Sequence, residues 1–140
     1  MSRITLDSPE SYAFSVEIPV RITDINYGNH LGHDAIMSIL HEARVRLLND
    51  KGFSEIDIGG CGMIMADTVI VFKSEVFYPA TLTCELAVGN LSRSSFDVFY
   101  RVSRVEDLAL IAEAKTGMVC FDYTRKRPAH MPDGFRAAFA

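Results

Sequence analysis

The sequence predicts an α+β fold in which one long helix packs against a curved antiparallel sheet, with the element order β-α-β-β-β-β. Three observations support this prediction. Apolar residues alternate with a period of two over residues 12–22, they recur at helical spacing over residues 33–51, and four strand-like segments follow without another helical period. The 140 residues suffice for one core, so we expect a single domain over residues 1–140.

The first two predicted elements are a strand and the long helix. Residues 12–22 place large apolar side chains on one face of a strand. Pro19 has no N–H to donate, so this strand should lie at the sheet edge or carry a bulge. The helix over residues 33–51 should end at Gly52, which suits the left-handed conformation that closes many helices. Its apolar stripe consists of Ile36, Ile39, Leu40, Ala43 and Leu47.

Four further strands are predicted, and they are expected to curl around the helix. A helix of this length extends over roughly 28 Å, so its stripe needs a wide sheet. Several strands are apolar on both faces, so the outer face and the edges of the sheet should be covered by a second copy of the chain. We therefore expect at least a homodimer. The strands are Gly62–Phe72, Thr81–Leu91, Phe96–Val102 and Leu108–Tyr123.

The composition of the chain indicates which kinds of binding partner and which cellular location to expect. The formal net charge is -4, which argues against nucleic acid or an anionic membrane as the main partner. The chain has no apolar run of about 18 residues, and its start is polar where a secretory signal would be apolar, so we expect a cytoplasmic protein. Cys61, Cys84 and Cys120 lie far apart in apolar surroundings, which favours core thiols over a disulfide, a zinc site or a nucleophile.

One polar segment stands out before the helix. The stretch TDINYGNHLGHD, residues 23–34, contains two of the four histidines. With its flanks, VRITDINYGNHLGHDAIMSILHEARVRLL, it resembles the signature of the 4-hydroxybenzoyl-CoA thioesterase-like branch of the hotdog-fold acyl-CoA thioesterases. That signature reads D-x-D-x-x-G-H-V-N-N, followed by an apolar helix that ends in E-A-R. The resemblance continues through VFKSEVFYPATLTCELAVGNLSRSSFDVFYRV and covers residues 14–123.

The resemblance implies a hotdog fold, a homodimer or homotetramer, and a site at the dimer interface. The substrate would be an acyl-CoA or acyl-carrier-protein thioester, hydrolysed without a metal or other cofactor. Such chemistry needs an activated water and donors for the developing oxyanion. The helix start near Gly32 offers free N–H groups, and the resemblance places the amide that polarises the thioester carbonyl at His33.

The resemblance also assigns catalytic residues, with two departures from the family. Gly28 and Gly32 stand where relatives often carry asparagine or aspartate. Asn26 stands where the family carries the second aspartate, and a neutral amide cannot accept a proton. The predicted scheme is therefore a water activated by His33 or His30 and oriented by Asp24 and Asn26. Each of these residues could instead have a purely structural role. Asp24 and Asn26 suit turns, and either histidine could be a hydrogen-bonded packing residue.

Substrate contacts are predicted from fainter features. Met63 and Met65 follow a glycine-rich approach and could line an acyl tunnel, although plain core positions are the commoner use of such residues. Arg93, with the basic run at residues 125–127, could pair with CoA phosphates. We thus expect Gly32, Met63, Met65 and Arg93 to contact substrate.

Two other functions fit the same residues. Hotdog hydratases resemble D-x-N-P-x-H, and Asp24, Asn26 and His30 come within one residue of that spacing but lack the proline. A non-catalytic acyl-CoA binding protein is the second alternative, because the absent aspartate permits it.

Overall fold

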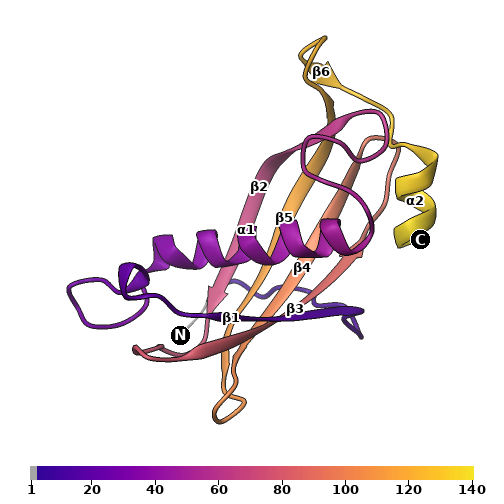
Figure 1. The fold of residues 1–140 in the computed structure, drawn as a ribbon. Helices are drawn as coiled ribbons and strands as arrows, with labels where there is room; N and C mark the ends of the chain where they lie inside the picture. The colour runs from indigo at the N-terminus through magenta and orange to yellow at the C-terminus, as the bar shows by residue number, and fades with distance from the viewer. Residues whose placement is uncertain (1–2) are drawn as a thin grey trace.

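The computed structural model describes residues 3–140 (Figure 1). A short 3-10 helix, Ile22–Asp24, separates the first strand from the long helix. The other elements are β1 (Phe14–Pro19), α1 (His33–Asp50), β2 (Gly62–Phe72), β3 (Thr81–Gly89), β4 (Ser95–Arg104), β5 (Leu110–Asp122), β6 (Arg127–Pro128) and α2 (Asp133–Phe139).

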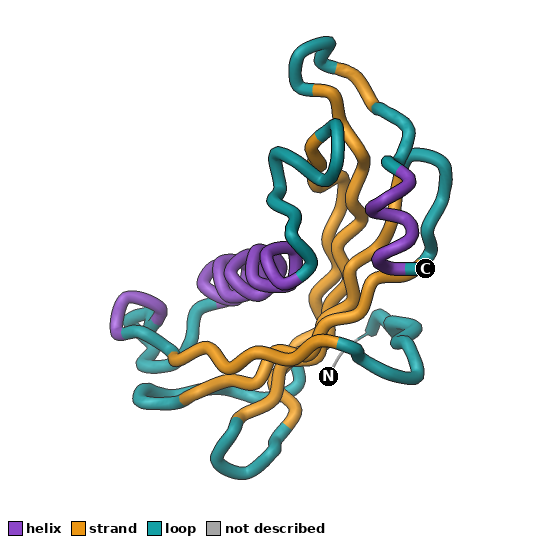
Figure 2. Tube along the Cα trace, turned by 45° about the vertical axis from the view of Figure 1, so that its right-hand side comes forward, coloured by secondary structure: helices purple, strands orange, loops and turns teal. Residues whose placement is uncertain are grey.

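The strands form one antiparallel sheet in the order β1-β3-β4-β5-β2, and β6 pairs with β5. Figure 2 shows that the sheet bends around α1, which lies across its inner face. This is the predicted hotdog arrangement, and the predicted fold class is confirmed. The edge position expected from Pro19 is also confirmed, because β1 lies at one end of the strand order.

The predicted boundaries differ from the structure by one to three residues at most elements. For example, the strand predicted over Thr81–Leu91 ends at Gly89, and the one predicted over Leu108–Tyr123 covers Leu110–Asp122. The first strand ends at Pro19 rather than at residue 22, because the Asp24 carboxylate accepts a hydrogen bond from the Arg21 N–H and stabilises a 3-10 turn. The helix starts at His33 as predicted and ends at Asp50, and Gly52 follows with a φ of 81°. The strand β6 and the helix α2 were not predicted at all.

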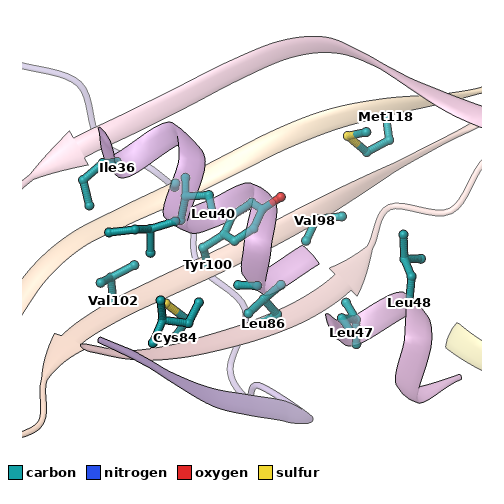
Figure 3. Close-up of a cluster of buried hydrophobic side chains, with 14 of the residues drawn as sticks. Ile36, Leu40, Leu47, Leu48, Cys84, Leu86, Val98, Tyr100, Val102 and Met118 are labelled. Carbon is teal, nitrogen blue, oxygen red and sulfur yellow. The ribbon is translucent and has the colours of Figure 1, made fainter. Parts of the chain in front are cut away.

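The apolar stripe of α1 forms the centre of the core (Figure 3). Its five predicted members are buried, and they pack against buried side chains of the sheet. Because the helix stripe and the inner face of the sheet bury each other, α1 is held in a fixed position across the sheet. The sheet residues labelled with it in Figure 3 are Cys84, Leu86, Val98, Tyr100, Val102 and Met118.

The thiols behave as core groups. Cys84 and Cys120 are buried, Cys61 is half-buried, and all three are free. Burial raises the pKa of Cys84 to about 12 and that of Cys120 to about 11. Burial likewise raises the pKa of Cys61, so none of these thiols readily forms the reactive thiolate near neutral pH. The prediction of core thiols is confirmed.

A polar network crosses the core beside α1. The Arg44 guanidinium is almost fully buried, and it donates to Glu55 Oε2 at 2.9 Å and to the Tyr100 hydroxyl at 3.0 Å. The Tyr100 hydroxyl also lies 2.7 Å from Thr116 Oγ1, and His41 Nε2 lies 2.6 Å from Glu55 Oε1. These bonds satisfy polar groups that would otherwise destabilise the core. They connect the middle of α1 to β4, β5 and the loop before β2.

Replacing Glu55 by glutamine should reduce the free energy of unfolding, and the reduction should depend on pH. Burial alone raises the pKa of the Glu55 carboxyl, but hydrogen bonds from Arg44 and His41 lower it by more, so the pKa lies below its ordinary value of 4.5. A carboxyl group whose pKa is lower in the folded than in the unfolded protein stabilises the fold at pH values above its unfolded-state pKa. This stabilisation is lost as the pH falls through the folded-state pKa. The difference in urea midpoint between wild type and Glu55→Gln should therefore shrink from about pH 5 to about pH 3.

Glu42→Gln provides the matched control for this pH series. Glu42 pairs with Arg46 at 2.8 Å, but both side chains are exposed on α1. Such a pair is worth only about 0.3 to 0.5 kcal/mol, so its removal should change the midpoint little at any pH. A constant difference between wild type and Glu55→Gln across the series would contradict the assigned ion pair.

Candidate active site

The segment between the 3-10 helix and α1 folds into a tight loop. Ile25 and Leu31 form an isolated antiparallel bridge. Within the loop, the Asn26 N–H donates to the His30 carbonyl at 3.0 Å, and the Asn29 N–H donates to the Asn26 carbonyl at 3.0 Å. Asn29 adopts a left-handed φ of 71°, which asparagine tolerates better than most residues. The backbone therefore fixes the place of His30 at the end of this loop.

Two further backbone bonds attach the end of this loop to its surroundings. The Leu31 N–H donates to the Val76 carbonyl at 2.8 Å, which joins the loop to the segment between β2 and β3. The Gly32 N–H donates to the Asp24 carbonyl at 3.0 Å, which joins it to the 3-10 helix. His30 and the first turn of α1 are thus held against residues that are distant in the sequence.

The first turn of α1 keeps two unpaired backbone donors. Gly32 is the N-cap, and its carbonyl accepts from the N–H groups of Ala35 and Ile36. No side chain caps this helix start. Within residues 3–140, no group accepts a hydrogen bond from the N–H of His33 or of Asp34. These two amides lie at the positive end of the helix dipole, where an oxyanion is stabilised.

A cavity of about 230 Å³ lies beside the start of α1. Both predicted histidines line it. The His33 ring stacks on the Phe72 ring, with 3.9 Å between the centroids and 17° between the planes. His30 Nε2 lies 3.7 Å from Glu75 Oε1, and the His30 ring meets the Phe77 ring edge-on at 6.1 Å. The other lining residues are Leu31, Ile36, Lys73, Ser74, Val76 and Ile111.

Asp24 lies outside this cavity and has its own partner. Its side chain is 5% exposed, and its carboxylate accepts hydrogen bonds from the N–H, Nε and Nη2 groups of Arg21. The sequence analysis expected Asp24 and Asn26 to orient the attacking water, but the first strand ends at Pro19 and the Asp24 carboxylate pairs with Arg21 in the 3-10 turn that follows. Asp24 therefore holds the turn before the site, and both carboxylate oxygens are occupied.

Asn26 also lies outside the lining of the cavity. Its side-chain oxygen accepts a hydrogen bond from the Gly28 N–H at 2.9 Å, a typical turn of asparagine. The Asn26 side chain nevertheless lies close to His30, and Gly28 lies between them. A Cβ atom added at Gly28 would lie 3.1 Å from Asn26 Oδ1 and 3.6 Å from His30 Nε2. Asn26 thus supports the loop that carries His30.

Of the predicted substrate contacts, only Gly32 lies at the start of α1. Met63 is buried in the core, whereas Met65 is 39% exposed and lines a separate depression beside Arg44. Arg93 donates to His130 Nε2 at 2.8 Å. Figure 1 shows the turn between β3 and β4, which carries Arg93, beside α2 and away from the start of α1. Within one protomer these three residues do not share the cavity.

Sequence reasoning missed the cavity residues that the end of β2 and the β2–β3 connection contribute. Phe72 of β2 and Lys73, Ser74 and Glu75 of the connection line the cavity, although they belong to no recognisable catalytic motif. Their only signal was a break in the apolar pattern after the second strand. Within residues 3–140, no group of three or more histidine, cysteine, aspartate or glutamate side chains is arranged to hold a metal ion. No helix in the described part of the chain is long and apolar enough to cross a membrane.

Comparisons with known proteins agree with this geometry. A family model described as the thioesterase-like superfamily matches residues 20–139. A search of curated proteins finds no match. A 1,4-dihydroxy-2-naphthoyl-CoA thioesterase from Synechocystis superposes with a TM-score of 0.82 at 22% identity, over 90% of this chain and 94% of that chain.

Two further solved structures have the same fold. The PA2801 protein of Pseudomonas aeruginosa superposes with a TM-score of 0.82 at 28% identity, over 93% of this chain and 100% of that one. A DHNA-CoA thioesterase from Staphylococcus aureus superposes with a TM-score of 0.78 at 21% identity, over 89% and 84% of the two chains. The fold similarity thus extends over nearly the full length of the domain.

Proposed function

Since the chain belongs to the thioesterase-like superfamily, we propose that it is an acyl-CoA thioesterase that hydrolyses a thioester to a free acid and CoA. One observation carries the proposal: two backbone amides without acceptors, those of His33 and Asp34, begin a helix beside a cavity that His30 also lines. Oxyanion donors and a base within one site are what hydrolysis of an acyl group requires.

In the proposed mechanism, the thioester carbonyl oxygen binds at the N–H groups of His33 and Asp34. A water molecule attacks the carbonyl carbon while His30 accepts one of its protons. The negative charge that develops on the carbonyl oxygen is stabilised by the two amides and the helix dipole. The intermediate then expels the CoA thiolate, which takes the proton from His30. The overall balance is one thioester and one water giving one acid and one thiol.

His33 and the predicted polar residues take supporting roles in this proposal. The His33 ring, stacked on Phe72, forms an aromatic wall of the cavity, and its backbone supplies a donor. Asp24 holds the 3-10 turn through Arg21, and Asn26 shapes the loop. We assign the base to His30 because it lines the cavity and its Nε2 lies 3.7 Å from the Glu75 carboxylate, whereas the His33 ring packs against Phe72.

We also propose that the active form is a cytoplasmic homodimer or homotetramer of this single domain. Met65 and Arg93 lie outside the cavity of their own protomer, and in the proposed oligomer a second protomer brings them to the substrate. The acyl donor is an acyl-CoA, with an acyl-carrier protein as the alternative. Two fold relatives carry the name of dihydroxynaphthoyl-CoA thioesterases, which makes CoA esters of aromatic acids the first substrates to test.

The test is a panel of aromatic and aliphatic acyl-CoA esters assayed for release of free thiol. We expect at least one ester to give thiol and free acid in equal amounts, with turnover proportional to protein concentration. Crotonyl-CoA, monitored for hydration without thiol release, tests the hydratase alternative. Thermal stabilisation by acyl-CoA without turnover of any ester would instead indicate a binding protein.

A further inference from the structure

The cavity contains a carboxylate that the sequence motif does not supply. Asp24 is occupied by Arg21, and Asn26 is neutral. Among residues 3–140, Glu75 is the one acidic residue that lines the cavity. It lies in the connection between β2 and β3, more than forty residues after the motif that contains His30. Glu75 Oε1 lies 3.7 Å from His30 Nε2, close enough for an ion pair when the imidazole is protonated.

Hydrogen bonds from two other parts of the chain hold the backbone around Glu75. The N–H groups of Lys73 and Ser74 donate to the Ile111 carbonyl of β5, at 2.8 and 3.3 Å. The Arg104 guanidinium donates to the Glu75 carbonyl at 2.8 Å and is itself held by Asp107 at 2.9 Å. These hydrogen bonds fix the backbone position from which the Glu75 side chain extends.

The same backbone also couples Glu75 to His30. The bond from the Leu31 N–H to the Val76 carbonyl joins the residues that directly follow His30 and Glu75. A single hydrogen bond therefore sets the two side chains next to each other at the mouth of the cavity. Such fixing by the scaffold is the general requirement for a pre-organised catalytic pair.

We propose that Glu75 is the positioning carboxylate of this site, and that it orients His30 and stabilises its protonated form during the reaction. This inference rests on the proposed thioesterase function. With Nε2 directed at Glu75, the neutral ring carries its proton on Nε2, and Nδ1 is free to accept a proton from water. As the O–H bond of water breaks and the C–O bond forms, His30 becomes a cation facing the Glu75 carboxylate. His30, positioned by Glu75, thereby supplies the proton acceptor that Asn26 cannot provide.

If His30 and Glu75 formed only a surface contact, the variants would behave differently. The side chains of His30 and Glu75 are 34% and 67% exposed, so their ion pair contributes little to stability. If the pair were only a surface contact, removing the charge would leave both stability and kcat nearly unchanged. If Glu75 positions the base, kcat falls while the fold and KM are preserved.

The experiment is a double-mutant cycle on the full chain with Glu75→Gln, His30→Ala and the double variant. The substrate is the acyl-CoA ester that the wild-type protein hydrolyses fastest. We expect Glu75→Gln to lower kcat by about 10- to 100-fold, with KM changed less than about 3-fold. In the His30→Ala background, Glu75→Gln should have no further effect on kcat, because Glu75 acts through His30. Glu17→Gln, at an exposed carboxylate of β1, is the matched control and should keep wild-type kcat.

The outcomes separate this inference from the proposed function. If the wild-type protein releases thiol but Glu75→Gln retains its kcat, the assignment of Glu75 is wrong and the thioesterase proposal stands. If the loss from Glu75→Gln persists in the His30→Ala background, Glu75 acts on the substrate or water directly, which overturns its positioning role. If the wild-type protein releases no thiol from any ester, the proposed function fails and the assignment fails with it. Melting temperatures within a few degrees of wild type show that the variants are folded.

Discussion

Replacing His33 by proline should lower kcat by about 10²- to 10³-fold relative to replacing it by alanine. His33→Ala removes the imidazole but keeps the backbone N–H, whereas His33→Pro removes both. The ratio between the two variants therefore measures the backbone donor alone. The expected size is that of losing one oxyanion donor in other acyl-transfer sites.

The local geometry makes this substitution possible. His33 is the first residue of α1, the position at which helices accept proline most readily, and its N–H has no acceptor to lose within the described protein. Gly32, which would precede the proline, has φ -71° and ψ 150°, an extended conformation that proline requires of its predecessor. The urea midpoints of the two variants should therefore be similar.

The same comparison tests which part of His33 matters. Equal kcat values for His33→Pro and His33→Ala would contradict the oxyanion role of its amide. A His33→Ala variant that loses nearly all activity would instead return the base to His33, the alternative that the sequence left open. Glu17→Gln, at an exposed carboxylate of β1, is the control and should keep wild-type kcat.

The helix could be predicted because its apolar residues recur at helical spacing, and the four long strands because each is a long strand-like run without that spacing. The stripe of α1 runs over several turns, and β2 was predicted with the bounds that the structure has. In contrast, β6 has two residues and α2 has seven, which is too short for a period to emerge. Only Phe135 of α2 is fully buried, and one buried residue gives no pattern along the chain.

The site was predictable only where its residues are close in the sequence. His30, Gly32 and His33 belong to one loop and one helix start, so the motif placed them correctly near each other. Glu75 reaches His30 through pairing between the loop and the β2–β3 connection, which no local pattern indicates. Closeness in the sequence was not sufficient at Asp24. The strand was expected to run through residue 22, but it ends at Pro19, and the Asp24 carboxylate bonds Arg21 and stabilises the 3-10 turn that follows.

The helix α2 offers the largest expected effect on stability. Phe135 is fully buried, and its ring centroid lies 4.8 Å from those of Phe96 and Phe139 and 5.3 Å from that of Phe53. Replacing it by alanine leaves a cavity among three aromatic rings, and such changes cost about 3 to 5 kcal/mol. Urea unfolding at one fixed protein concentration measures the loss, since association would otherwise shift the midpoint.

The control for this prediction is Ile56→Ala. Ile56 is 79% exposed, so its truncation should change the free energy of unfolding by no more than about 0.5 kcal/mol. If Phe135→Ala lowers the free energy of unfolding by less than about 1 kcal/mol, α2 does not dock on the core as described. Removing a fully buried phenylalanine ring lowers this free energy by more than that. Since α2 lies away from the start of α1 (Figure 1), kcat of the folded fraction should stay at the wild-type value. Phe135 would then contribute to stability without affecting catalysis, which takes place at the start of α1.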